Sequence, residues 1–159
     1  MLKINMKRSK SEEQIAAFIN ISAVNAMFVI YEKKGDQYQE VYVNEQFVEG
    51  VKVVGGSSNN QILVVTGGGG GGTGIWQSDH HVVRYTPQGY KEVWKGIATN
   101  RENLPIANYH LQQNGMIGFD AGGSELYYAQ ITSVPTSSGL FQLYKYNEQK
   151  SEYELVISY

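Results

Sequence analysis

Three segments of this chain share one form, and they constrain its fold more than any other feature. In each, an apolar stretch ends in a tyrosine, a polar turn follows, and a second stretch opens with Tyr-x-x-Val. These segments span residues 28–41, 82–93 and 143–156, and the tyrosines that frame each turn are 7, 5 and 7 positions apart. Strand side chains alternate between faces with period two, so a difference of two keeps each tyrosine on its face. The pattern predicts three related β-hairpins.

A second kind of apolar hairpin lies between these three. It spans residues 51–65, around a turn rich in glycine, serine and asparagine, and again residues 116–129. Equivalent positions such as Tyr31 and Tyr85 are 54 residues apart, which leaves room for about four strands per unit. Short runs of Val, Ile, Tyr and Phe separated by turn residues complete the pattern. The sequence therefore predicts an all-β chain of repeated antiparallel hairpins.

This alternation resembles the FG-GAP or VCBS-like repeats of β-propeller proteins, in which a glycine- and aspartate-rich turn hairpin alternates with an aromatic hairpin. The resemblance covers residues 27–158. It implies a propeller-like arrangement and, because such repeats are often extracellular, a location at the bacterial envelope or outside the cell. In that family the turn is similar to a calcium loop, but residues 55–62 and 120–126 here have lost most of those carboxylates. Calcium takes about six to eight oxygen ligands, so we expect no calcium and no other cofactor.

The chain is too short for a complete propeller. Closed propellers use roughly four to eight blades, whereas the units here number about two and a half. We therefore expect either a propeller-like fragment or a two-sheet β-sandwich. A fragment has free strand edges, through which we expect pairing with another chain and homo-oligomerisation.

One segment near the N-terminus has the pattern of a helix. Ser11 and Gln14 have the spacing of a capping box, and apolar side chains after them fall on one helical face. The pattern predicts a short helix over residues 11–20. We expect residues 1–10 to form a basic tail and residues 11–159 to form a single β-rich domain. The basic residues are not followed by an uninterrupted apolar stretch, so we expect no signal peptide.

Charge and composition exclude several classes of function. The 13 basic and 15 acidic side chains give a net charge of −2, which does not provide the basic field that nucleic acids attract. Without cysteine, the chain has no thiol catalysis, thiolate zinc site or disulfide. No apolar run approaches the roughly 20 residues of a membrane-spanning helix. We expect no nucleic-acid partner and no membrane span, and the compartment stays open between the cytoplasm and the cell exterior.

The most conspicuous local feature is the run from Gly67 to Gly72. A phosphate-binding loop needs Lys followed by Ser or Thr and then a helix, and the following Ile75-Trp76-Gln77 supplies neither. The run is therefore predicted to be a flexible connection between strands. The alternative is a rim over a binding site, with Trp76 as the residue that contacts the ligand.

Asp79, His80 and His81 are candidate metal ligands or acid-base residues. On a strand, Asp79 and His81 share one face and His80 points to the other, so the two histidines do not bind one metal ion. The alternative function that this segment suggests is a small metal-assisted hydrolase that uses Asp79, His81 and His110, with Asp120 as a further candidate ligand.

Aromatic side chains supply the main functional prediction. Tyrosine and tryptophan bring a large rigid contact area and a polar tip at little entropic cost. We expect a non-catalytic binding or protein-interaction module that binds a protein or a carbohydrate. The residues predicted to contact that ligand are Trp76, Trp94, Tyr127 and Tyr128.

Overall fold

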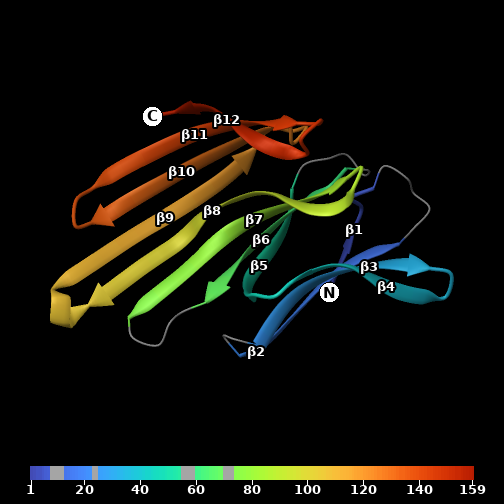
Figure 1. Ribbon diagram of the computed structural model, residues 1–159, viewed down its shortest axis with the longest axis horizontal. Coiled ribbons are helices and arrows are strands. Elements are labelled where there is room, and N and C mark those ends of the chain that lie inside the picture. Colours follow the sequence, from blue (N-terminus) through green and yellow to red (C-terminus); the bar gives the residue numbers. More distant parts are fainter. Residues whose placement is uncertain (8–12, 23–24, 55–59, 70–73) are drawn as a thin grey trace.

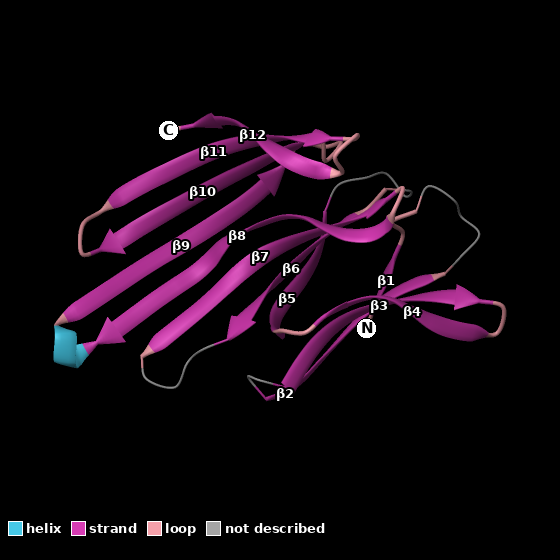
Figure 2. Ribbon diagram, viewed as in Figure 1, coloured by secondary structure: helices cyan, strands magenta, loops and turns pink. Residues whose placement is uncertain are grey.

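The computed structural model spans the chain, and its described part comprises residues 1–7, 13–22, 25–54, 60–69 and 74–159. That part consists of antiparallel strands and one short 3-10 turn (Figures 1 and 2). It contains no helix with the length and apolar character that a membrane crossing requires. The elements are β1 (Leu2–Ile4), β2 (Gln14–Ser22), β3 (Asn25–Lys34), β4 (Gln37–Asn44), β5 (Phe47–Val54), β6 (Ile62–Gly69), β7 (Ile75–Thr86), β8 (Gly89–Leu104), η1 (Pro105–Ala107), β9 (Tyr109–Phe119), β10 (Glu125–Val134), β11 (Ser138–Asn147) and β12 (Glu152–Ser158).

The strands form two antiparallel sheets in which neighbours in sequence are neighbours in space. The small sheet has the order β1-β2-β3-β4, and the large sheet runs from β5 at one edge to β12 at the other without a crossover. The predicted fold class, an all-β chain of antiparallel hairpins, is confirmed. Neither sheet closes into a barrel or a propeller in the part of the chain that the structure describes.

Two hydrophobic cores lie on opposite faces of strands β5 to β8. Side chains of β6 alternate between them, because Leu63 and Val65 join the first core whereas Ile62 and Val64 join the second. The small sheet covers the first core, to which it contributes the fully buried Phe28. The unbroken apolar run at the start of β6 therefore belongs to a strand that is buried on both faces.

The second core is enclosed because the large sheet folds over itself. β8 pairs with β7 from Gly89 onward, whereas its register with β9 runs from Thr99 to Leu104. The first half of β8 thus diverges from β9, and Trp94 fills the space together with Leu126 of β10. In Figure 1, strands β9 to β12 lie at the upper left and the small sheet at the right, with β5 to β8 between them.

The five predicted hairpins correspond to paired strands, although the turn between β5 and β6 lies mostly outside the described residues. In two of the three aromatic hairpins the tyrosines are directly opposite one another. These pairs, Tyr85 with Tyr90 and Tyr146 with Tyr153, each have ring centroids 5.1 Å apart. In the β3–β4 hairpin a register shift places Tyr31 opposite a glutamate instead. The three hairpins therefore share a strand pattern but differ in side-chain environment.

The predicted helix over residues 11–20 is wrong, because this segment contributes strand β2, which pairs with β3. Ser11 lies outside the described residues. Gln14 does not complete a capping box, since its Oε1 accepts a hydrogen bond from the backbone N–H of Met6 at 2.9 Å. The isoleucines of β2 are β-branched and favour extended structure, and the ladder with β3 outweighs the helical spacing of the apolar residues.

The described N-terminal residues belong to the folded domain rather than to a tail. Strand β1 pairs with β2, and Met6 is buried in the first core. Lys3, one of the basic residues of the predicted tail, forms an ion pair with Glu13 at 2.7 Å. Residues 8–10 of the predicted tail lie outside the described part of the chain.

Candidate functional site

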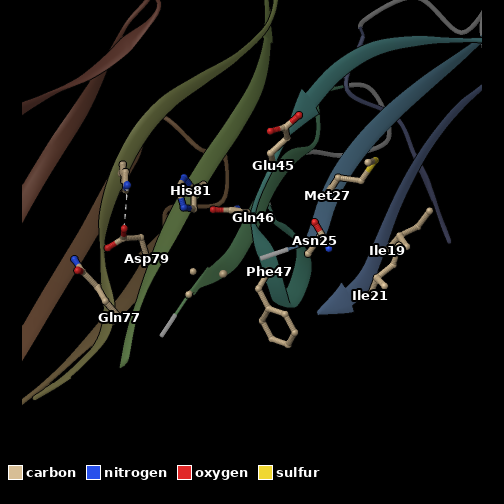
Figure 3. Close-up of a pocket in the computed structure, with 15 residues that line it drawn as sticks. Ile19, Ile21, Asn25, Met27, Glu45, Gln46, Phe47, Gln77, Asp79 and His81 are labelled. Carbon is tan, nitrogen blue, oxygen red and sulfur yellow. Dashed lines mark ion pairs between the residues drawn. The ribbon is translucent and has the colours of Figure 1, made fainter. Parts of the chain in front are cut away.

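A cleft of about 850 Å³ opens between the small sheet and strands β6 to β8 of the large sheet (Figure 3). One wall comes from β2 and β3, the other comes from β7 and β8, and the segment Glu45–Phe47 lies between them. This volume falls within the range of about 300–1,000 Å³ that is typical of small-molecule sites. The cleft is therefore large enough for a small ligand.

Apolar side chains form the wall contributed by the small sheet. Ile19 of β2 lies directly opposite Met27 of β3, and Ile21 follows Ile19 near the end of the strand. Ile19 is 56% exposed and Ile21 is 79% exposed. Large apolar side chains that are exposed together indicate an interaction site, whereas isolated ones do not. This wall is therefore available for contact with a ligand.

One ion pair and one histidine–glutamate hydrogen bond characterise the opposite wall and the strands that carry it. Lys95 Nζ lies 2.9 Å from Asp79 Oδ2, and His81 Nδ1 lies 2.6 Å from Glu92 Oε2. All four side chains come from β7 and β8, where His81 and Lys95 occupy directly opposed positions. The side chain of His81 is only 7% exposed. The charges of this wall are thus largely compensated within the protein.

The hydrogen bond between His81 and Glu92 determines where the proton lies. It holds the pKa of Glu92 below its usual range, against the opposing effect of partial burial. Glu92 is therefore a carboxylate at neutral pH, and Nδ1 of His81 carries the proton that it donates. The described residues provide no hydrogen-bond partner for Nε2 of His81.

The lowered pKa of Glu92 predicts a loss of stability in acid. A carboxyl group with a lower pKa in the folded state contributes stability above its unfolded pKa, and this contribution is lost as the pH falls through the folded pKa. We expect the free energy of unfolding to fall as the pH drops through and below the usual glutamate range, and Glu92→Gln to reduce this fall. Urea denaturation at a series of pH values measures it. Glu148→Gln, at an exposed glutamate, is the control; an equal acid response in both variants would contradict the prediction.

Gln46 brings an unpartnered donor to the same cleft. Its Nε2 is buried and has no hydrogen-bond partner among the described residues, and in Figure 3 its side chain points toward His81. Buried polar atoms in proteins are nearly always hydrogen-bonded to protein or to ordered water. The cleft thus presents a donor that the described protein atoms leave unsatisfied.

Glycines of β6 lie along the base of the cleft. The glycine run predicted a flexible connection, but this prediction is wrong for Gly67–Gly69, because they pair with residues 77–79 of β7. A Cβ at Gly68 would lie 2.1 Å from the backbone oxygen of Gln77. The two backbones approach too closely at this point for a side chain, which explains the glycine. The remainder of the predicted connection, residues 70–72, lies outside the described residues.

Of the four aromatic residues predicted to contact a ligand, Trp76 is linked to the cleft. Its ring packs edge-on against Phe47, which lines the cleft, with centroids 6.2 Å apart. Its Nε1–H donates a hydrogen bond to Glu49 Oε1 at 3.1 Å. Trp76 therefore supports the position of Phe47 at the edge of the cleft.

The other three predicted aromatic residues lie elsewhere. Trp94 and Tyr128 are buried in the second core, with ring centroids 5.2 Å apart, and burial raises the pKa of Tyr128 to about 12. Tyr127 points to the opposite face of β10, where its hydroxyl donates to Glu125. Trp94 and Tyr128 thus serve packing, and none of these three residues lines the cleft.

The structure brings together two of the four candidate metal ligands. Asp79 and His81 share one face of β7, as predicted, and both line the cleft. His80 points away from them. Its Nδ1 lies 2.9 Å from Thr66 Oγ1, and its Nε2 lies 3.2 Å from the backbone oxygen of Gly115. Burial lowers the pKa of His80, which favours its neutral form.

The other two candidate ligands are remote from this pair. His110 of β9 lies opposite Asn103 of β8, whereas Asp79 of β7 lies opposite Ile97 of β8. Asn103 and Ile97 are six residues apart, which corresponds to about 20 Å along β8. Asp120 lies in the turn before β10 and accepts a backbone hydrogen bond there at 2.7 Å. In the described part of the chain, no group of three or more His, Asp or Glu side chains is placed to hold a metal ion.

Comparison with protein-family models, with curated proteins and with solved structures gave no match for this chain. The resemblance to FG-GAP or VCBS-like repeats therefore stays a prediction. The candidate site rests on the geometry of the cleft.

Proposed function

We propose that this chain is a non-catalytic binding module whose ligand occupies the cleft between the two sheets. The observation that carries the proposal is the contrast between the walls of the cleft. One wall exposes large apolar side chains such as Ile19, whereas the opposite wall presents polar side chains such as Asp79, and Gln46 between the walls brings an unsatisfied Nε2. Ligand pockets combine apolar surface with a few polar groups that orient the ligand in this way.

The charged residues of the cleft support binding rather than catalysis. Asp79 is paired with Lys95, and Glu92 with His81, so these two carboxylates are already held by a cation or a hydrogen-bond donor. Nucleophilic catalysis requires an activated nucleophile within hydrogen-bond reach of a base. Ser78, next to Asp79 in sequence, is fully buried and lies on the opposite face of β7.

Substitution of the apolar wall tests this proposal. Ile19→Asp places a carboxylate on that wall, and we expect it to weaken ligand retention at least about tenfold because the charge must be desolvated on binding. Ile131→Asp is the matched control, because Ile131 is an isoleucine with similar exposure, 49%, on β10. Binding is measured with immobilised protein against a glycan panel and a displayed peptide library.

The expected result is a ligand that wild type and Ile131→Asp retain and that Ile19→Asp loses, with unchanged circular dichroism for all three proteins. Equal retention by the two variants would place the binding surface elsewhere. Failure of the wild-type chain to retain any member of either collection would also contradict the proposal.

A further inference from the structure

We infer that the cleft takes a neutral, polyhydroxylated ligand of the carbohydrate class. This inference rests on the proposed function, because it names the ligand class for the same cleft. It follows from the arrangement of polar groups in the cleft, from the charges that line it, from the position of the apolar side chains and from the occupied backbone groups of Val48 in β5.

The Asp79–Lys95 pair matches two neighbouring hydroxyl groups. A carboxylate oxygen accepts hydrogen bonds and an ammonium group donates them, and here the two atoms are 2.9 Å apart. Gauche hydroxyls on adjacent sugar carbons have a similar oxygen–oxygen separation, and each hydroxyl both donates and accepts. One hydroxyl donates to Asp79 while its neighbour accepts from Lys95, and the ion pair stays intact.

Gln46 and His81 provide a second position for a hydroxyl. The buried Nε2 of Gln46 is a donor without a partner among the described residues, and His81 lines the same cleft. A hydroxyl accepts from Gln46, and because it also donates, it pairs with Nε2 of His81 whether or not that nitrogen carries a proton. An ammonium group cannot accept from Gln46. A group with both capacities fits best.

The charges of the cleft disfavour an anionic ligand, because Asp79 and Glu45 both line it. A cationic ligand would compete with Lys95 for Asp79, whereas hydroxyl groups add to the existing ion pair. Hydrogen bonds to charged groups are stronger than those between neutral groups, so this pair contributes affinity without a charged ligand.

The apolar side chains suit the C–H groups of a sugar ring. Figure 3 shows Phe47 between Ile19 and Ile21 on one side and Gln77 and Asp79 on the other. A pyranose ring has hydroxyl groups at its rim and C–H groups on its faces. A ring bound by its hydroxyls to the polar wall therefore directs C–H groups toward the apolar residues.

An extended peptide is the main competing occupant, and the edge of β5 disfavours it. A peptide that adds to a sheet needs free backbone N–H and C=O groups at the edge strand. At Val48 of β5 the side chain of Asn20 takes both, since its Nδ2 donates to the Val48 oxygen at 2.7 Å and its Oδ1 accepts from the Val48 nitrogen at 3.0 Å. Asn20 thus occupies the backbone groups of β5 at Val48, beside the apolar wall.

Nuclear magnetic resonance titration of the full ¹⁵N-labelled chain tests the inference. The probes are cyclohexane-1,2-diol with cyclohexanol as its matched control, and the methyl glycosides of glucose, mannose and galactose. We expect saturable shifts of the Gln46 side-chain amide and the His81 ring nitrogens with the diol and with at least one glycoside. Cyclohexanol should bind at least about tenfold more weakly, because it leaves one polar group of the site unpaired.

Asp79→Asn provides the variant for this titration, with Asp36→Asn in the exposed β3–β4 turn as its control. We expect the first to weaken glycoside binding at least about tenfold, because it abolishes the carboxylate, and the second to have no effect. Equal binding of diol and cyclohexanol, or no saturable shift with any glycoside, would overturn the carbohydrate class. A library peptide that wild type retains and Ile19→Asp loses, combined with silent glycosides, would refute this inference and leave the proposed function in place. If Ile19→Asp retains every ligand that the wild-type chain retains, both the proposed function and this inference fail.

Discussion

Replacement of Trp94 by alanine is expected to lower the free energy of unfolding by about 3–5 kcal/mol, the cost of removing a large aromatic side chain from a core. Trp94 is 8% exposed, and its ring centroid lies 5.2 Å from that of Tyr128 and 5.6 Å from that of Tyr144. The ring also covers Gly96, where a Cβ would lie 2.3 Å from it. Alanine would therefore leave a cavity between β8 and the strands that fold over it.

Urea denaturation followed by far-ultraviolet circular dichroism measures this loss. Trp76→Ala is the control, because Trp76 is half-buried, and its loss should cost about 1 kcal/mol. If Trp94→Ala had the same free energy of unfolding as the wild-type chain, the second core would not be what holds strands β9 to β12 in place. The experiment also separates packing from recognition, because a folded Trp94→Ala protein should keep its ligand affinity.

The hairpins could be predicted because their information is local. Tyr85 and Tyr90 flank a short turn, and the alternation of side chains on either side of it sets the register within a few residues. The same holds for Tyr146 and Tyr153. Which hairpins join into one sheet depends on contacts between distant segments, and no local pattern encodes the division into sheets of four and eight strands.

The N-terminal error shows how weak a local helix signal is. The spacing of Ile15, Phe18 and Ile19 suits one face of a helix, but alternation along a strand places Ile15 and Ile19 on one face and Phe18 on the other. Phe18 is paired with Phe28 of β3. This pairing between strands decides the structure, and a single segment read alone does not reveal it.

The candidate site was predictable only in part. The sequence placed Asp79 and His81 on one face, since that follows from strand alternation. It missed Lys95 and Glu92, because their positions depend on a register shift between Val82 and Val83 that moves Lys95 opposite His81. It also missed Ile19, which had been assigned to a helix. Correct pairing of the β7–β8 hairpin, with its bulge, was the information needed.

Gly115→Ala is expected to lower the free energy of unfolding by about 3 kcal/mol, the upper end of the usual cost of overpacking. Gly115 follows Asn114, which pairs with Thr99 as the last pair of the ladder between β8 and β9. A Cβ at Gly115 would lie 1.8 Å from the backbone oxygen of Ile97 and 3.0 Å from the ring of Tyr128. The first of these is a backbone atom, so the clash cannot be relieved by a side-chain rotation. β9 would have to move away from β8 where the sheet begins to fold over.

Gly118→Ala is a matched control on the same strand, because a Cβ at Gly118 meets nothing within 4 Å. There the substitution should leave stability unchanged or raise it by about 0.4–1 kcal/mol, since alanine restricts the unfolded chain more than glycine does. Urea midpoints of the two variants give the comparison. The NMR signal of His80, whose Nε2 lies 3.2 Å from the Gly115 oxygen, should shift in Gly115→Ala and not in Gly118→Ala. Equal stability of the two variants would mean that β8 and β9 do not approach closely at Gly115, and the enclosure of the second core would then need another explanation.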